Sequence, residues 1–228
     1  MNVQIKGGRI LSLNGRRVIQ RSVPHHGGRW ATHRPCGIVF HYTAGCGSDL
    51  TGVFTDRNVS AHFSVDREGT VYQYVPLGRI AWHADNANGF YVGIEHTALP
   101  GRCDLTDEQL KASAALSAAI VQWAKRRRGV DIPLRKVDGP ALVPGFHDHA
   151  DGDGQSWNFS RHTDRLYGWT WERYLRRVQA YVTPYELYDA TKIQFRRFAS
   201  MDEALQAVRK RVGAGRVIRL RDLRKEAS

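Results

Sequence analysis

The sequence predicts an α/β fold in which helices flank a mixed central β-sheet. Two observations predict it. Segments rich in apolar and β-branched residues, as in buried strands, mix with two longer segments of helical periodicity, and the chain has no internal repeat. The composition, with 42% apolar and 25% charged residues over 228 positions, is typical of a globular chain that needs no disulfide to bury its core.

The first predicted core element is a strand that begins at Gly37. Residues 37–44 form a mainly apolar run that stops at the loop beginning with Gly45. His41 lies towards the C-terminal end of this run, where α/β folds tend to place chemistry. Residues 1–34 contain glycine pairs and one short alternating stretch, so we expect an irregular N-terminal arm with a hairpin.

A hairpin, a strand and two helices follow. Residues 59–75 hold two alternating runs separated by Asp66-Arg-Glu-Gly69, in which glycine supplies a positive φ. Residues 91–97 read as another strand. Residues 106–128 begin with a capping-box pattern and end at a glycine, as a helix does. Residues 169–181 predict a second helix.

The last part of the chain predicts a small β-α-β appendage. Residues 192–198 and 216–220 resemble strands, and residues 201–212 resemble a helix. This tail is rich in arginine, and two interpretations stay open: it packs on the main domain, or it binds a polyanion. The expected boundaries are an arm at 1–34, a main domain at 35–183 and the appendage at 184–228.

The net charge of +12 and the isoelectric point near 10 indicate a partner that is a polyanion. Nucleic acid, anionic lipid and anionic wall polymers all qualify, but no nucleic-acid-binding signature is present, so we expect no nucleic acid. No apolar run approaches the ~20 residues that span a bilayer, so we expect no membrane span. The first residues lack the apolar core of a secretory signal, so we expect synthesis in the cytoplasm.

Histidine and aspartate residues suggest a metal site. Two neutral imidazoles and one carboxylate form a common catalytic zinc set, and His41, His147 or His149, and Asp164 are the candidates. The chain has ten histidines, and such residues are more often solvated or satisfied in the core. Spacing alone therefore does not distinguish this set from the background.

Five motifs in one order resemble a known family. His41-Tyr-Thr-Ala is followed by a Ser-Ala-His-Phe-Ser-Val-Asp stretch and by Gln-Tyr-Val-Pro. Ala-Trp-His-Ala and Val-Gly-Ile-Glu95 come after them. Together they resemble the type-2 N-acetylmuramoyl-L-alanine amidases, which include phage lysins, wall-recycling amidases and peptidoglycan-recognition proteins. The resemblance covers about residues 35–182 and implies a zinc amidase acting on bacterial peptidoglycan.

The resemblance also implies roles for individual residues. His41, His147 and Asp164 match the three Zn²⁺ ligands, and Glu95 matches the general base. His162 stands where many relatives have a lysine that stabilises the transition state. Because the stretch before Asp164 is longer than in the recycling amidases, His149 stays open as the second ligand, although His147 is preferred.

Three further residues are expected to contact substrate. His83 and Trp82 lie in the segment that lines the substrate groove in relatives, and Tyr42 directly follows the first ligand. Plain packing is the alternative interpretation for each of them.

The biological role is expected to be that of a phage endolysin. A strongly basic enzyme suits an anionic wall, and such an enzyme would be made in the host cytoplasm and act on the wall after release. The alternatives are a cytoplasmic enzyme of muropeptide recycling and a non-catalytic peptidoglycan-binding module. The presence of Asp164 and Glu95 favours catalysis over the binding module.

Overall fold

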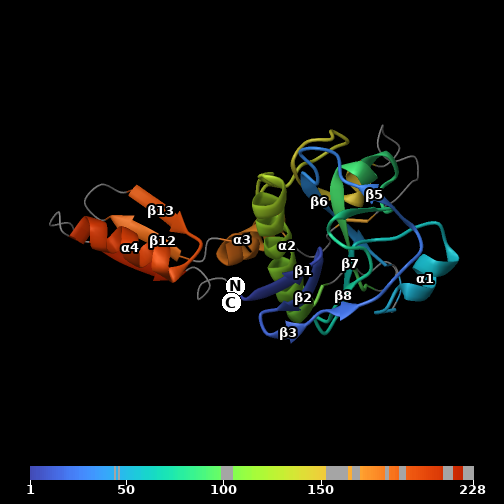
Figure 1. The fold of residues 1–228 in the computed structure, drawn as a ribbon, viewed down its shortest axis with the longest axis horizontal. Helices are drawn as coiled ribbons and strands as arrows, with labels where there is room; N and C mark the ends of the chain where they lie inside the picture. Colours follow the sequence, from blue (N-terminus) through green and yellow to red (C-terminus); the bar gives the residue numbers. More distant parts are fainter. Residues whose placement is uncertain are drawn as a thin grey trace.

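The structure is a computed structural model that describes residues 1–43, 45, 47–98, 105–152, 164–165, 170–182, 185–189, 194–212 and 218–222. Its centre is a six-stranded sheet with helices packed against it (Figure 1). The predicted α/β class is therefore confirmed.

The central sheet is mixed and has the strand order β11-β6-β10-β7-β8-β4. Strands β11, β6, β10 and β7 run parallel, β8 is antiparallel to β7, and β4 is parallel to β8. Strands β6 and β10 are buried almost throughout, as parallel strands covered on both faces are. The strand bounds are Ile19–Gln20 (β4), Gly37–Tyr42 (β6), Phe63–Val65 (β7), Val71–Gln73 (β8), Tyr91–His96 (β10) and Gly145–Asp148 (β11).

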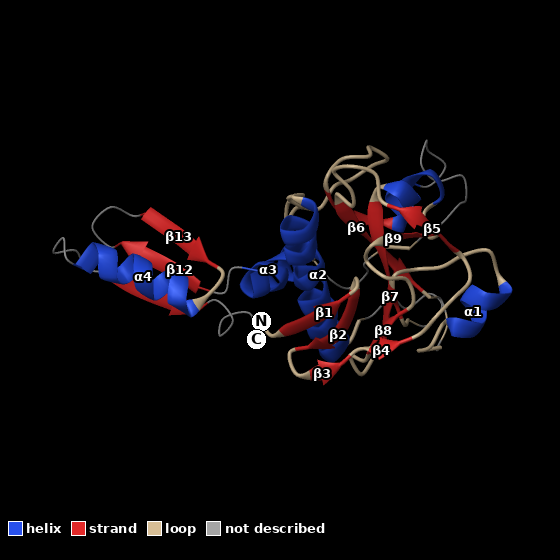
Figure 2. Ribbon diagram, viewed as in Figure 1, coloured by secondary structure: helices blue, strands red, loops and turns tan. Residues whose placement is uncertain are grey.

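Helices α2 (Asp107–Arg128) and α3 (Trp171–Val182) cover one face of this sheet (Figure 2). Phe40 of β6 makes an edge-to-face contact with Tyr174 of α3, with ring centroids 4.9 Å apart. Both side chains are buried, so this face belongs to the main hydrophobic core.

The other face carries shorter elements, which lie away from α2 in Figure 1. A two-stranded sheet pairs β5 with β9. The bounds are His26–Arg29 (β5), Thr51–Asp56 (α1), Arg79–Ala81 (β9) and Asp85–Gly89 (the 3-10 helix η1). Because side chains alternate along a strand, His41 and Glu95 project from this face, opposite Phe40.

Local sequence signals produce the predicted turns and caps. The Thr106 hydroxyl accepts a hydrogen bond from the Gln109 N–H at 3.1 Å, which satisfies one of the unpaired donors at the start of α2. Gly129 ends the helix at φ 65°. Gly69 closes the β7–β8 hairpin at φ 79°, a conformation that glycine adopts without strain.

The N-terminal segment is more ordered than the predicted arm. A separate three-stranded sheet is formed by β1 (Val3–Lys6), β2 (Arg9–Leu13) and β3 (Arg16–Arg17), and β4 then joins the central sheet. The fully buried Gln73 side chain accepts from the Ile10 N–H at 2.8 Å. Residues 1–34 therefore pack on the central sheet.

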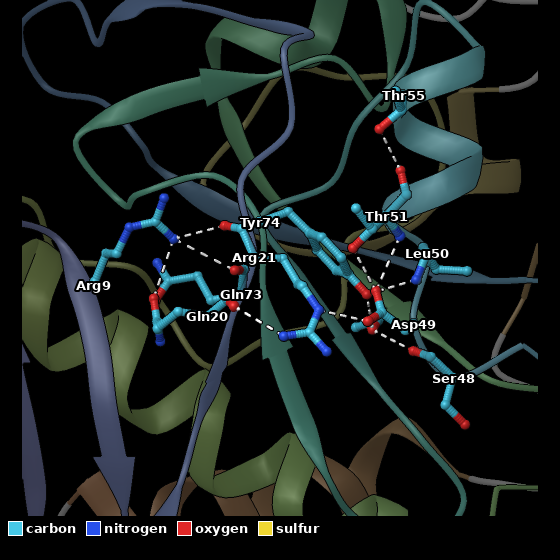
Figure 3. Close-up of polar contacts among 11 residues, drawn as sticks. Arg9, Gln20, Arg21, Ser48, Asp49, Leu50, Thr51, Thr55, Gln73 and Tyr74 are labelled. Atoms are coloured by element: carbon cyan, nitrogen blue, oxygen red, sulfur yellow. Dashed lines mark hydrogen bonds and ion pairs between the residues drawn. The ribbon is translucent and has the colours of Figure 1, made fainter.

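Polar contacts hold this segment in place (Figure 3). Arg9 Nη1 donates to Gln20 Oε1 at 3.1 Å, and Arg21 Nε donates to Asp49 Oδ2 at 2.5 Å. The second contact ties the residue that follows β4 to the loop that precedes α1. The first contact lies within the N-terminal segment, and the second joins residues that are 28 positions apart.

The C-terminal part has one strand more than predicted. Strand β12 (Tyr185–Asp189) is central in a three-stranded antiparallel sheet of order β13-β12-β14. The expected elements are present as β13 (Gln194–Phe198), α4 (Met201–Val212) and β14 (Ile218–Asp222). Among the described helices, none is long and apolar enough to cross a membrane.

Candidate metal centre

Three side chains converge at the C-terminal edge of the parallel strands. His41 comes near the end of β6, and His149 begins the 3-10 helix η2 (His149–Gly152) directly after β11. The Nδ1 atoms of the two histidines lie 3.0 Å apart. Asp164 Oδ2 lies 3.1 Å from His149 Nδ1 and 3.5 Å from His41 Nδ1. All three side chains are largely withdrawn from solvent.

This triangle of ligand atoms has the dimensions of a zinc site. Zinc binds imidazole nitrogen and carboxylate oxygen at about 2.0–2.2 Å in a tetrahedron, so two of its ligands lie about 3.3 Å apart. The three separations here, 3.0, 3.1 and 3.5 Å, match that edge length. Among the described residues, this is the one His/Cys/Asp/Glu group with metal-ligand spacing. A metal held by these three residues would have a fourth position available for water or substrate.

His147 does not join this group, which corrects the sequence-based preference for it over His149. The register of β11 and β6 pairs His147 with Val39, two residues before His41. Its Nε2 donates instead to the Val143 carbonyl at 3.0 Å. The register ends with Asp148 opposite Phe40, so the next residues of the two segments, His149 and His41, come side by side.

The carboxyl groups of Asp164 and Glu95 have pKa values that are shifted in opposite directions. Burial alone would raise the pKa of Asp164, but the hydrogen bond from His149 and the adjacent His41 ring hold that pKa well below its ordinary value. For Glu95, burial and the nearby negative charge of Asp164 raise the pKa to about 8. Glu95 pairs in register with His41 on the neighbouring strand, about 4.8 Å away. The two side chains therefore share one face.

His83 was expected to contact substrate, but both of its ring nitrogens face protein groups. Nδ1 lies 3.0 Å from His41 Nε2, and Nε2 lies 3.0 Å from the Tyr91 carbonyl oxygen. Burial, together with His41 nearby, lowers the pKa of His83 well below its ordinary value. The sequence did not indicate this contact between two histidines.

The other expected substrate contacts have different surroundings. Trp82 is 37% exposed and stacks on His25 of the N-terminal segment, beside His83. Tyr42 is partly exposed, and strand alternation directs it to the face opposite His41. His162 lies outside the described residues.

The turn that carries His149 is held by a lysine that sequence reasoning missed. Lys136 Nζ donates to Asp151 Oδ2 at 2.5 Å and lies 3.6 Å from Asp148 Oδ2. Asp151 Oδ2 also accepts from the Asp148 N–H at 2.7 Å. Because the partners are distant in sequence, only the Lys136-Val-Asp138 and Asp148-His-Ala-Asp151 charge patterns could have hinted at this pairing.

Comparison with known proteins places this geometry in a family. The family model described as N-acetylmuramoyl-L-alanine amidase matches residues 31–165, which is more than half of the chain. The chain belongs to this amidase family. The resemblance inferred from the five sequence motifs is thereby confirmed, and the matched region spans all three residues of the triangle.

Two curated proteins are similar to this amidase-family chain. It is 40% identical over 101 residues to the 1,6-anhydro-N-acetylmuramyl-L-alanine amidase AmpD of Escherichia coli (strain K12). That match covers 37% of this chain and 54% of the relative, so the chain spans about half the length of the curated relative. The AmpD of Citrobacter freundii is 38% identical over 73 residues, covering 28% of this chain and 37% of the relative.

Solved structures share the fold at lower identity. A selenomethionine derivative of AmpD superposes with a TM-score of 0.52 at 21% identity, covering 71% of this chain and 93% of that chain. The Staphylococcus aureus hydrolase AmiA, in complex with its ligand, gives a TM-score of 0.55 at 15% identity, with coverage of 73% and 83%. These likenesses concern the fold of the amidase domain.

Proposed function

We propose that this protein is a zinc-dependent hydrolase that cleaves the amide bond between N-acetylmuramic acid and L-alanine in bacterial peptidoglycan. The observation that carries the proposal is the triangle of His41, His149 and Asp164, in a chain that belongs to the amidase family. Its edge lengths fit a tetrahedral zinc ion, and its ligand types are those of catalytic zinc sites.

The proposed ligands fit the metal in number, type and charge. Zinc in such a site supplies a Lewis acid that polarises a carbonyl group and lowers the pKa of a coordinated water. The single carboxylate of Asp164 compensates part of the metal charge, and its low pKa keeps it ionised. The two imidazoles bind in their neutral form.

Glu95 is the proposed general base. Its side chain shares a face with His41, one strand away, and therefore faces the position at which a water molecule would attack the amide. Amide hydrolysis also requires a positive group near the developing oxyanion. His162, two residues before the proposed ligand Asp164, stays our proposed contributor to that stabilisation.

Zinc removal and a Glu95 variant test the proposal together. Chelator-treated protein should release no stem peptide from a purified muropeptide, and added zinc should restore release, as followed by mass spectrometry. Glu95→Gln should retain zinc yet lose activity by about 10²–10⁴-fold, because the proton acceptor is missing. Glu108→Gln, a change at an exposed glutamate, serves as the control. Full activity of zinc-free protein would refute the proposal.

The biological role that we propose is that of a phage endolysin, and the net charge of +12 supports it. Adhesion to an anionic wall favours a basic enzyme. A second candidate is an enzyme that acts on soluble 1,6-anhydro muropeptides, because the E. coli relative carries that activity in its name. Turnover of insoluble wall compared with turnover of a soluble 1,6-anhydro muropeptide separates the two roles.

A further inference from the structure

His83 connects the proposed ligand His41 to the backbone of β10. Its Nδ1 lies 3.0 Å from His41 Nε2, the ring nitrogen of His41 that points away from the triangle. Its Nε2 lies 3.0 Å from the Tyr91 carbonyl oxygen. The ring planes of the two histidines are perpendicular, with centroids 5.1 Å apart.

The positions of the hydrogens follow from the carbonyl. A carbonyl oxygen only accepts, so the hydrogen of a neutral His83 ring lies on Nε2 and is donated to Tyr91. Nδ1 of His83 is then an acceptor. The His41 nitrogen that faces it must donate, so neutral His41 carries its hydrogen on Nε2. Its Nδ1, which lies in the triangle with His149 and Asp164, then carries the lone pair that a metal would use.

The position of the His83 ring depends on a glycine. A Cβ atom added at Gly93 would lie 2.5 Å from His83 Cγ, a contact too short for real side chains. The imidazole therefore lies directly on β10 where that strand has no side chain. The backbone of His83 is also held, because its main-chain N–H donates to Asn88 Oδ1 at 2.7 Å. Backbone, amide and carbonyl groups thus hold the ring in one orientation.

We propose that His83 is a positioning residue that fixes His41 in its Nε2–H tautomer and so presents Nδ1 to the metal. This inference rests on the proposed zinc site and revises the expected substrate contact of His83. Second partners that orient ligating histidines affect metal affinity by about 10–100-fold. Gly93 acts through His83, because the missing side chain makes room for the ring.

The variants His83→Asn and His83→Leu, whose new side chains have nearly equal shape, test the role of His83 Nδ1 as an acceptor. Asparagine at position 83 offers an amide oxygen close to where Nδ1 was, whereas leucine offers none. In zinc-free protein, ¹⁵N spectra of the histidine rings should show His41 protonated at Nε2 in the wild type and in His83→Asn. In His83→Leu the two tautomers should mix, and zinc affinity should fall about 10–100-fold in a chelator competition.

A glycine pair tests the same inference without altering the histidine. Gly93→Ala should weaken zinc binding as His83→Leu does. If the His83→Leu protein does not fold, Gly93→Ala takes its place in the test. Gly52→Ala, at a helical position with nothing within 4 Å of the added carbon, should bind zinc like the wild type.

The outcomes separate this inference from the proposed function. A wild type without zinc affinity contradicts the proposed function, while the tautomer spectra of zinc-free protein still test His83. Wild-type zinc affinity and an unchanged His41 tautomer in both His83→Leu and Gly93→Ala would overturn the inference. So would equal losses in the asparagine and leucine variants. A raised KM with unchanged zinc affinity in these variants would indicate instead that His83 contacts substrate.

Discussion

At the scale of single residues, neighbouring backbone groups decide which nitrogen of each histidine carries a proton. His62 shows this most clearly. It accepts from the Gly93 N–H at Nδ1 and donates from Nε2 to the Arg79 carbonyl. The bond from Gly93 requires the neutral ring, because an imidazolium has no acceptor nitrogen, and the side chain is fully buried. Sequence reasoning predicted such a packed, hydrogen-bonded histidine as the more frequent case.

His62 should make the fold sensitive to acid. Burial lowers its pKa to about 4, below the ~6.5 of an unfolded chain, so the unfolded state binds the proton first. The stability that His62 contributes is therefore complete above pH 6.5 and is lost as the pH falls towards 4. The loss amounts to about 3 kcal/mol.

Denaturant titrations at pH 7 and pH 4.5 measure this effect. The wild type should lose more free energy of unfolding between the two pH values than His62→Gln, whose side chain does not titrate. Equal losses in the two proteins would show that other groups cause the acid sensitivity.

At the scale of elements, the register of parallel strands decides which residues meet. The pairing of β11 with β6 brings His149 level with His41 and leaves His147 beside Val39. The sequence did not reveal this register, because it aligns residues 108 positions apart and depends on the packing of the whole sheet. The sequence therefore narrowed the proposed second ligand to two residues, and the structure brings His149 rather than the preferred His147 beside His41 and Asp164.

The turn from β11 to η2 should depend on the buried lysine beneath it. Lys136→Met leaves the Asp151 carboxylate, whose side chain is 3% exposed, without its cation. Losing one partner of a buried pair should lower the free energy of unfolding by about 3 kcal/mol. Zinc affinity should also fall, because this turn carries His149.

An exposed ion pair provides the control. Lys125 donates to Asp131 at 2.5 Å, but both side chains are more than half exposed. Lys125→Met should change stability little, since solvent screens such pairs. If Lys125→Met and Lys136→Met have equal effects on chemical denaturation, the turn does not depend on burial of the lysine.

At the scale of the whole molecule, the sequence predicted the α/β core, the family and the elements of the C-terminal appendage, but it did not predict the pairing of the N-terminal segment or strand β12. The hairpin, the capped helix and the strand that carries His41 follow local patterns, which the sequence displays directly. The pairing of β4 with β8 is long-range, so residues 1–34 were expected to be an arm. Strand β12 was not predicted because Glu186 and Asp189 are residue types that strands disfavour.

The C-terminal part should bind cell wall if its basic character serves adhesion. Removing residues 184–228, in which lysine and arginine outnumber acidic residues, should reduce co-sedimentation with purified wall. Hydrolysis of a soluble muropeptide should persist, since the proposed site lies within residues 41–164. Added salt should weaken wall binding of the intact chain, because it screens exposed charge. Unchanged sedimentation of the shortened chain would assign the tail a packing role.

The most direct test of the central claim is an anomalous-scattering map of zinc-loaded crystals, collected at the zinc edge. The account predicts one strong peak about 2.0–2.2 Å from His41 Nδ1, His149 Nδ1 and Asp164 Oδ2. A peak within bonding distance of His147 instead of His149 would contradict this account. So would the absence of a peak in crystals of protein that still releases stem peptide.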